Sequence, residues 1–83
     1  DVAEIERRLE AEPDSDPIRI ELAIALAGRT EYEPALDHLI SDVKARGEGK
    51  DDARKAMLDI FEVLGDGHPL TTTYRRQLAS ALF

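Results

Sequence analysis

Residues 22–43 read LAIALAGRTEYEPALDHLISDV and decide the fold, because they hold two apolar helical patterns separated by a short break at Gly28–Arg29–Thr30. In the second pattern the apolar side chains return every third or fourth residue, which is the repeat of one face of an α-helix. They are Tyr32, Ala35, Leu36, Leu39, Ile40 and Val43. The stretch therefore predicts a helical hairpin, to which the rest of the chain adds helices before and after.

The break inside this hairpin carries signals for one helix end and one helix start. Gly28 is suited to the left-handed conformation that closes many helices. Thr30 and Glu33 have the spacing of a capping box, in which each side chain accepts a hydrogen bond from the other residue's backbone N–H. We expect the first helix to end at Ala27 and the second to begin after Thr30. Pro34, which lacks an N–H, should make the first turn of the second helix irregular without breaking the helix.

The segment before the hairpin predicts a short helix, a turn and a helix start. Residues 1–12 carry one apolar stripe, which consists of Val2, Ile5 and Leu9. Pro17 suits the first position of the next helix, and Asp16 before it suits the N-cap. The helix over residues 17–27 is apolar on more than one side. It is therefore either packed on more than one side or leaves an apolar face for a partner.

The segment after the hairpin predicts two more helices. Gly47 is a candidate C-cap for the hairpin's second helix, and Asp51 or Asp52 is a candidate cap and dipole partner for the next one. That next helix repeats the apolar spacing of residues 32–43, with Ala53, Ala56, Met57, Ile60, Phe61 and Leu64. Gly65 should end it, and Pro69 should begin a last helix whose apolar residues are Leu70, Tyr74, Leu78 and Leu82. The fold prediction is all-α, with about five short antiparallel helices.

The length, net charge and cysteine content of the chain argue against several classes of function. The 83 residues form at most one small domain, carry a net charge of -7 and contain no cysteine. This charge argues against nucleic acid and against an anionic membrane, since phosphate groups are bound by clustered Lys and Arg. No apolar run approaches the length of a spanning helix, and no signal-peptide pattern opens the chain. We expect a soluble, cytoplasmic protein without a cofactor.

The hairpin over residues 16–47 has about the length of a tetratricopeptide unit of roughly 34 residues. With Ala35 at the small position of that motif's second helix, the agreeing positions are Pro13, Leu22, Ala23, Leu26 and Leu39. The chain departs from the motif at Arg19 instead of Trp, Thr30 instead of Gly, Asp42 instead of Ala, and Gly47 instead of Pro. The pattern resembles a tetratricopeptide-like, right-handed array of helical hairpins.

The second half carries a more distinctive likeness. Residues 53–65, ARKAMLDIFEVLG, are followed by His68-Pro-Leu and then by residues 74–83, YRRQLASALF. Together they resemble the C-terminal end of YbbN-type thioredoxin-like co-chaperones, and the likeness extends over essentially the whole chain. His68 is a departure, because family sequences often have Asp there, a better N-cap; we therefore expect the last helix to fray at its start.

This resemblance implies a domain organisation and a set of partners. Residues 1–83 would form a single tetratricopeptide-like domain at the C-terminal end of a longer, bacterial chain, with a thioredoxin-fold domain upstream. The partners it implies are chaperones of the chaperonin or Hsp70 type and unfolded client proteins.

Catalysis and metal binding find little support in the sequence. The serines and threonines lack any motif that would place a base beside them. His38 lies on the flank of an apolar stripe, and His68 lies in a turn. Neither histidine combines with a neighbouring carboxylate at convincing metal-ligand spacing, although Asp37 and Asp66 are near them in sequence. We therefore expect no enzyme and no metal site.

The candidates for partner binding are Ile20, Ile24, Ala27, Arg75, Arg76, Leu82 and Phe83. The first three hold the positions that line the concave groove of a tetratricopeptide hairpin, unless another helix covers them. The two arginines either form a solvated face or dock an acidic partner surface. The terminal pair either tucks into the bundle or engages another protein.

Two functions therefore remain open from the sequence. The first is a non-catalytic protein-interaction module of a co-chaperone. The alternative is a purely structural or self-associating domain that rigidifies the upstream thioredoxin domain.

Overall fold

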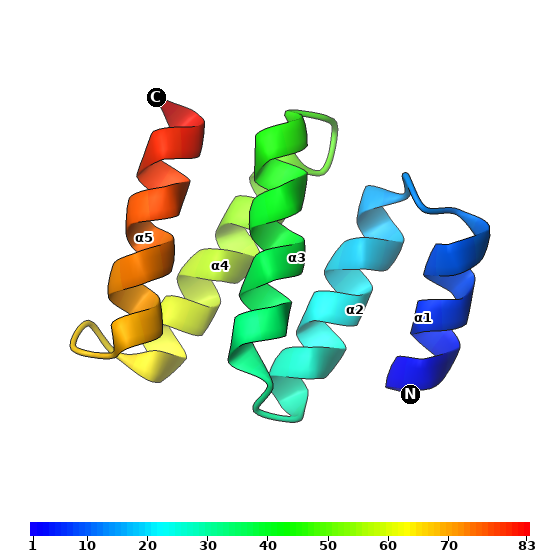
Figure 1. The fold of residues 1–83 in the computed structure, drawn as a ribbon, viewed down its shortest axis with the longest axis horizontal. Coiled ribbons are helices and arrows are strands. Elements are labelled where there is room, and N and C mark those ends of the chain that lie inside the picture. Colours follow the sequence, from blue (N-terminus) through cyan, green and yellow to red (C-terminus); the bar gives the residue numbers. More distant parts are fainter.

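The computed structural model describes residues 1–83 as five α-helices without a strand (Figure 1). The helices are α1 (Val2–Ala11), α2 (Asp16–Gly28), α3 (Tyr32–Ala45), α4 (Lys50–Leu64) and α5 (Pro69–Leu82). The all-α prediction and the predicted hairpin of α2 and α3 are therefore confirmed.

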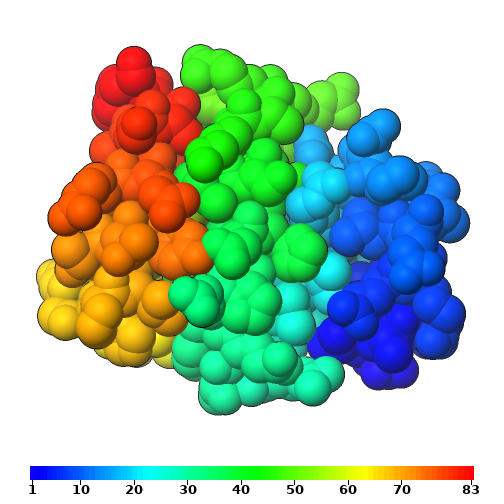
Figure 2. Space-filling model, in the orientation of Figure 1, coloured from blue at the N-terminus to red at the C-terminus, as the bar shows by residue number.

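Helix α3 is the centre of the molecule. It packs against α2, α4 and α5, whereas α1 packs against α2 alone. In Figure 1 α1, α2, α3 and α5 stand in a row, and α4 passes behind α3 and α5. The space-filling view shows α3, in green, in the middle of the face that this row presents (Figure 2).

The predicted apolar stripes form the core. On α3 the buried residues of the stripe are Ala35, Leu36, Leu39, Ile40 and Val43, and on α4 they are Ala53, Met57, Ile60 and Phe61. Helix α5 adds Tyr74 and Leu78, and α1 adds only Val2 and Ile5. The Tyr74 hydroxyl donates a hydrogen bond to the Asp37 carboxylate, which fastens α5 to α3.

The predicted N-cap of α2 is wrong by one residue. Ser15 is the N-cap, and its Oγ accepts a hydrogen bond from the Ile18 N–H at 3.3 Å. Asp16 is the first helical residue, and its Oδ2 accepts a hydrogen bond from the Gly49 N–H at 3.1 Å. Both residue types are good N-caps, so the partner at the start of α4 decides between them.

The predicted helix end at Gly28 and the predicted capping box are also wrong. Gly28 belongs to α2, and the left-handed residue is Thr30, with φ of 61°. An N-cap residue needs extended backbone, so Thr30 does not cap α3; its hydroxyl donates to the Arg29 carbonyl instead. Glu31 is the N-cap, without a side-chain hydrogen bond. Pro34 then lies within the first four helical residues, whose N–H groups have no partner in the helix, so α3 begins without a break.

Two further caps differ from the prediction, and two agree with it. Arg46, with φ of 57°, is the left-handed C-cap of α3 in place of Gly47. Gly49 is the N-cap of α4, so Asp51 and Asp52 do not cap it, although both lie in its first turn and complement the helix dipole.

Gly65 ends α4 with φ of 90°, and Pro69 begins α5. His68 is the N-cap of α5, and its Nδ1 accepts a hydrogen bond from the Leu70 N–H at 3.0 Å.

Candidate partner-binding groove

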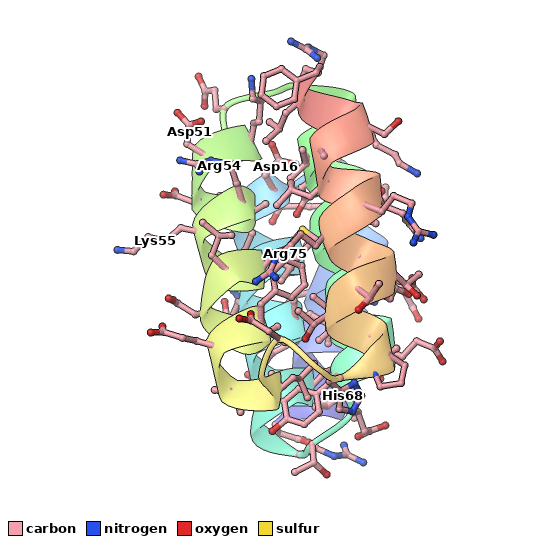
Figure 3. The ribbon with its side chains drawn as sticks, turned by 90° about the vertical axis from the view of Figure 1, so that its left-hand side faces the viewer. Asp16, Asp51, Arg54, Lys55, His68 and Arg75 are labelled. Atoms are coloured by element: carbon pink, nitrogen blue, oxygen red, sulfur yellow. The ribbon has the colours of Figure 1, made fainter.

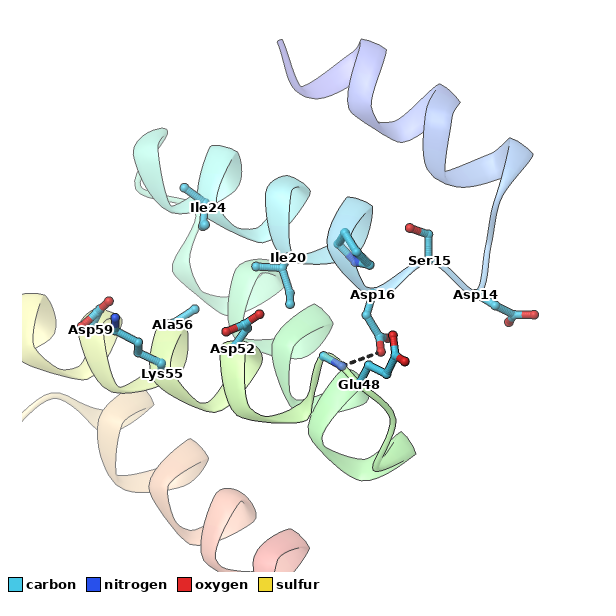
Figure 4. Close-up of a pocket in the computed structure, with 12 residues that line it drawn as sticks. Asp14, Ser15, Asp16, Ile20, Ile24, Glu48, Asp52, Lys55, Ala56 and Asp59 are labelled. Atoms are coloured by element: carbon cyan, nitrogen blue, oxygen red, sulfur yellow. Dashed lines mark hydrogen bonds between the residues drawn. The ribbon is translucent and has the colours of Figure 1, made fainter.

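An open groove runs between α2 and α4 (Figure 4). One part, of about 740 Å³, lies between the first turns of the two helices, and a second part, of about 370 Å³, continues toward their C-terminal ends. The two parts share Ile24, Ala56 and Asp59 as lining residues. They therefore form one surface, which we call the α2–α4 groove.

The parallel course of α2 and α4 creates this groove. Their N-terminal ends are joined by the hydrogen bond from the Gly49 N–H to Asp16. A Cβ on residue 49 would lie 2.4 Å from the Cβ of Asp16, so only glycine permits this close approach. Farther along, Gly28 at the end of α2 and Val63 near the end of α4 line the same part of the groove.

An ion-paired cluster fixes α2 to α3 next to this junction. The Arg19 Nη1 lies 2.7 Å from the Asp42 Oδ1 and 3.6 Å from the Asp16 Oδ1, and Arg19 also donates to the Pro13 carbonyl. The Asp42 side chain is fully buried, and its Oδ2 has no hydrogen-bond partner. Burial raises the pKa of Asp42 to about 6, and the nearby Asp16 carboxylate adds to the rise, although the Arg19 guanidinium opposes it.

The cluster explains two departures from the tetratricopeptide motif that the sequence shows separately. Arg19 stands in place of Trp and Asp42 in place of Ala, and the fold brings them together across the α2–α3 hairpin. Their opposite charges were the signal that could have linked them. The sequence analysis did not pair Arg19 with Asp42, and it therefore missed this ion-paired cluster.

The lining of the groove differs between its two ends. Toward the C-terminal ends of the helices it is apolar, and Ile24 and Val63 are 59% and 70% exposed there. Toward the N-terminal ends it is acidic, with carboxylates from Asp14, Asp16, Glu48 and Asp52, and Asp59 lies where the two parts meet. Lys55 is the one cation in the lining.

The structure brings three of the seven predicted binding residues together. Ile20, Ile24 and Ala27 all line the α2–α4 groove, and Figure 4 shows the first two facing α4. Helix α1 packs against α2 without lining the groove. The contribution of α4, including Asp52 and Val63, was missed; the exposed apolar Val63 outside the α4 stripe was the available signal.

The other four predicted residues lie elsewhere, on α5 and the chain end. Arg75 lies between α4 and α5 (Figure 3), 5.4 Å from the ring centre of Phe61 and 3.2 Å from the carboxylate of Asp66. Arg76 is exposed and forms no ion pair. Leu82 is half-buried against the core, whereas Phe83 is fully exposed. These residues do not line the groove.

The two histidines belong to different parts of the fold, since His38 lies on α3 and His68 lies directly before α5. His38 is half-buried, and its pKa is lowered by burial and by the Arg19 charge. His68 serves as the N-cap of α5. No group of three or more His, Cys, Asp or Glu side chains is placed to hold a metal ion. None of the helices is long and apolar enough to cross a membrane.

Comparison with known proteins gives one match. The family model of the tetratricopeptide repeat matches residues 1–83. No curated protein and no solved structure matches the chain.

Proposed function

Because the chain belongs to the tetratricopeptide repeat family, we propose that it is a non-catalytic protein-interaction module whose α2–α4 groove receives a segment of a partner protein. Domains of this type bind proteins in general. The observation that carries the proposal is the exposure of Ile24 and Val63, at 59% and 70%, on the same groove. Grouped exposed aliphatic side chains are typical of a surface that becomes covered on binding.

The partners that we propose follow from the sequence likeness over residues 53–83. We infer that the chain is the C-terminal domain of a YbbN-type thioredoxin-like co-chaperone, acting in the cytoplasm. Its partners would be a chaperonin or an Hsp70-type chaperone, together with unfolded client proteins. Arg75, Arg76, Leu82 and Phe83 would then form a second contact surface, on α5 and the chain end. The sequence encoded immediately before Asp1 tests this assignment, which requires a thioredoxin fold there.

Binding is tested with the 83-residue chain immobilised and offered a purified chaperonin, a purified Hsp70-type chaperone and a chemically unfolded client. We expect retention of at least one of them, lost in Ile24→Glu and reduced when Leu82 and Phe83 are deleted. Leu58→Glu is the matched control, because Leu58 is 41% exposed on α4 but does not line the groove. Equal retention by Ile24→Glu and Leu58→Glu would contradict a role for the groove. No retention of any of the three would contradict the co-chaperone assignment.

Exposed apolar residues also favour a second candidate function, in which the domain self-associates or rigidifies an upstream domain. Ile24, Val63 and Phe83 would then be covered by a second copy or by that domain. Sedimentation equilibrium of the 83-residue chain and of a longer chain separates the two functions. Self-association predicts a dimer that Ile24→Glu dissociates. A monomer at all concentrations, with no interface to the upstream domain, would contradict this second candidate.

A further inference from the structure

We propose that the segment received by the α2–α4 groove is basic and amphipathic, with Lys or Arg side chains at the N-terminal ends of α2 and α4 and apolar side chains at their C-terminal ends. This inference rests on the proposed function, because it names the chemistry of the segment that the groove binds. It is carried by the charges in the groove, by their spacing and by the separate apolar end.

The charge in the groove is strongly unbalanced. Asp14, Glu48, Asp52 and Asp59 line it and form no ion pair within the chain. Lys55 is the only cation in the lining, and it too is unpaired. An acidic segment would therefore be repelled, whereas a basic one would find carboxylates free to pair with it.

Structural roles explain only part of this acidity. Asp16 is engaged by the Gly49 N–H and by Arg19, and Asp52 lies in the first turn of α4, where a carboxylate complements the helix dipole. Asp14 and Glu48 lie outside the helices, and Asp59 lies in the middle of α4. Asp14 and Glu48 directly precede the N-caps Ser15 and Gly49, where a carboxylate also complements the helix dipole. Asp59 has no such role. Charge complementarity to a partner would account for Asp59 and for the unpaired excess of negative charge in the groove as a whole.

The spacing of the carboxylates favours several separate cations over a single ion. No three acidic side chains are placed to hold one metal ion. In Figure 4 they are spread along the groove, with Asp14 and Glu48 at one end and Asp59 farther along α4. A row of Lys or Arg side chains on one segment fits such a distribution.

The apolar end of the groove requires the bound segment to carry apolar side chains as well. It is lined by Ile24, Ala27, Tyr32, Ile60 and Val63, with Asp59 at the junction with the acidic end. A segment with apolar residues at helical spacing would cover Ile24 and Val63 there. Helix α2, of 13 residues, spans about 20 Å. A basic segment of similar length therefore reaches both ends.

The inference is tested by fluorescence anisotropy with two labelled peptides, each as long as α2, which has 13 residues. The first has Lys in its first turn and Leu at i, i+3, i+4 and i+7 after it. The second has Glu in place of each Lys. We expect the Lys peptide to bind the 83-residue chain at least about tenfold more tightly than the Glu peptide, and to weaken as salt is raised, because exposed charges are screened.

Matched variants locate the binding. Asp52→Asn should weaken the Lys peptide about two- to fivefold, the range of one exposed ion pair. Asp51→Asn removes the same charge from the same helical turn but lies outside the groove, so it should leave affinity unchanged. Equal effects of the two variants would overturn the assignment of the acidic end.

The remaining outcomes separate this inference from the proposed function. Equal binding of both peptides, lost in Ile24→Glu, would overturn the basic segment and leave the groove as a protein-binding site. Tighter binding of the Glu peptide would overturn the inference in the same way. No binding of either peptide would overturn the inference, and retention of the chaperones or client by the immobilised chain would then decide the proposed function separately.

Discussion

The carboxyl group of Asp42 is fully buried between helices, and this burial raises its pKa to about 6 even though the Arg19 guanidinium lies 2.7 Å away. An unperturbed Asp has a pKa of about 3.9. The folded state therefore holds the proton more tightly than the unfolded state does. Stability from this group is fully present below about pH 4 and is lost as the pH rises through about 6.

A measurable pH dependence follows from Asp42. Between pH 7 and pH 4 the free energy of unfolding should rise by about 2–3 kcal/mol through this residue. Asp42→Asn removes the titrating group and should abolish that part of the rise. Urea denaturation of both proteins at several pH values measures the difference, and the other carboxylates cancel in the comparison. A constant difference between the two proteins over this range would show that burial does not govern Asp42.

Gly49 offers a second test at the scale of one residue. A Cβ there would lie 2.4 Å from the Cβ of Asp16, which is fixed to its own backbone and cannot swing away. Gly49→Ala should therefore force α2 and α4 apart and lower stability by about 1–3 kcal/mol. Gly28→Ala is the control, because a Cβ there meets nothing within 4 Å, and it should gain up to about 1 kcal/mol of helix propensity. Thermal unfolding of the two variants should move in opposite directions.

The α2–α3 hairpin depends on Arg19 and Asp42 as a pair. Arg19→Met would leave the buried Asp42 charge without its partner, which costs about 3–5 kcal/mol in comparable cases. Asp42→Ala removes the buried charge and leaves Arg19 with Asp16 and the Pro13 carbonyl, so it should cost less. The double variant should be more stable than Arg19→Met alone. Chemical denaturation of all four proteins measures this coupling, and strictly additive effects would contradict it.

Sequence predicted the helices well because four of them have an apolar stripe that packs into the core, and α2 is apolar on more than one side. The helix ends were less predictable, since adjacent residues compete as caps. Ser15 and Asp16 are both good N-caps, and the choice depends on Gly49, which is far away in sequence. Thr30 and Arg46 adopt left-handed backbone, although Gly28 and Gly47 lie within two residues of them and are better suited to it. At the start of α2 a contact between helices therefore decides between two residues with the same local preference.

The groove was predictable only on its α2 side. Ile20, Ile24 and Ala27 follow from the position of α2 in the repeat, and all three line the groove. The α4 side depends on how closely α2 and α4 approach, which the missing side chain of Gly49 permits. The unbalanced charge likewise appears only when the loop carboxylates and those of α4 come together in space.

At the scale of the whole molecule, stability is distributed unevenly between the centre and the N-terminal edge. Helix α3 packs against three helices and buries six residues, whereas α1 packs against one helix and buries only Val2 and Ile5. The pair between Arg8 and Glu21, at 2.9 Å, also joins α1 to α2, but both side chains are about half exposed. Exposed pairs add little to stability. Helix α1 should therefore open without unfolding the rest.

Native-state hydrogen exchange tests this uneven distribution. Amides of α1 should exchange through a local opening with a lower free energy than those of α3, which should exchange only on global unfolding. Ile5→Ala removes one of the two buried contacts of α1 and should speed exchange in α1 while leaving α3 nearly unchanged. Leu39→Ala, in the centre of α3, should lower the global free energy of unfolding by about 2–5 kcal/mol and speed exchange in α3. If Ile5→Ala accelerated α1 and α3 equally, the five helices would unfold as one cooperative unit, because the single interface with α2 would then couple α1 fully to the core.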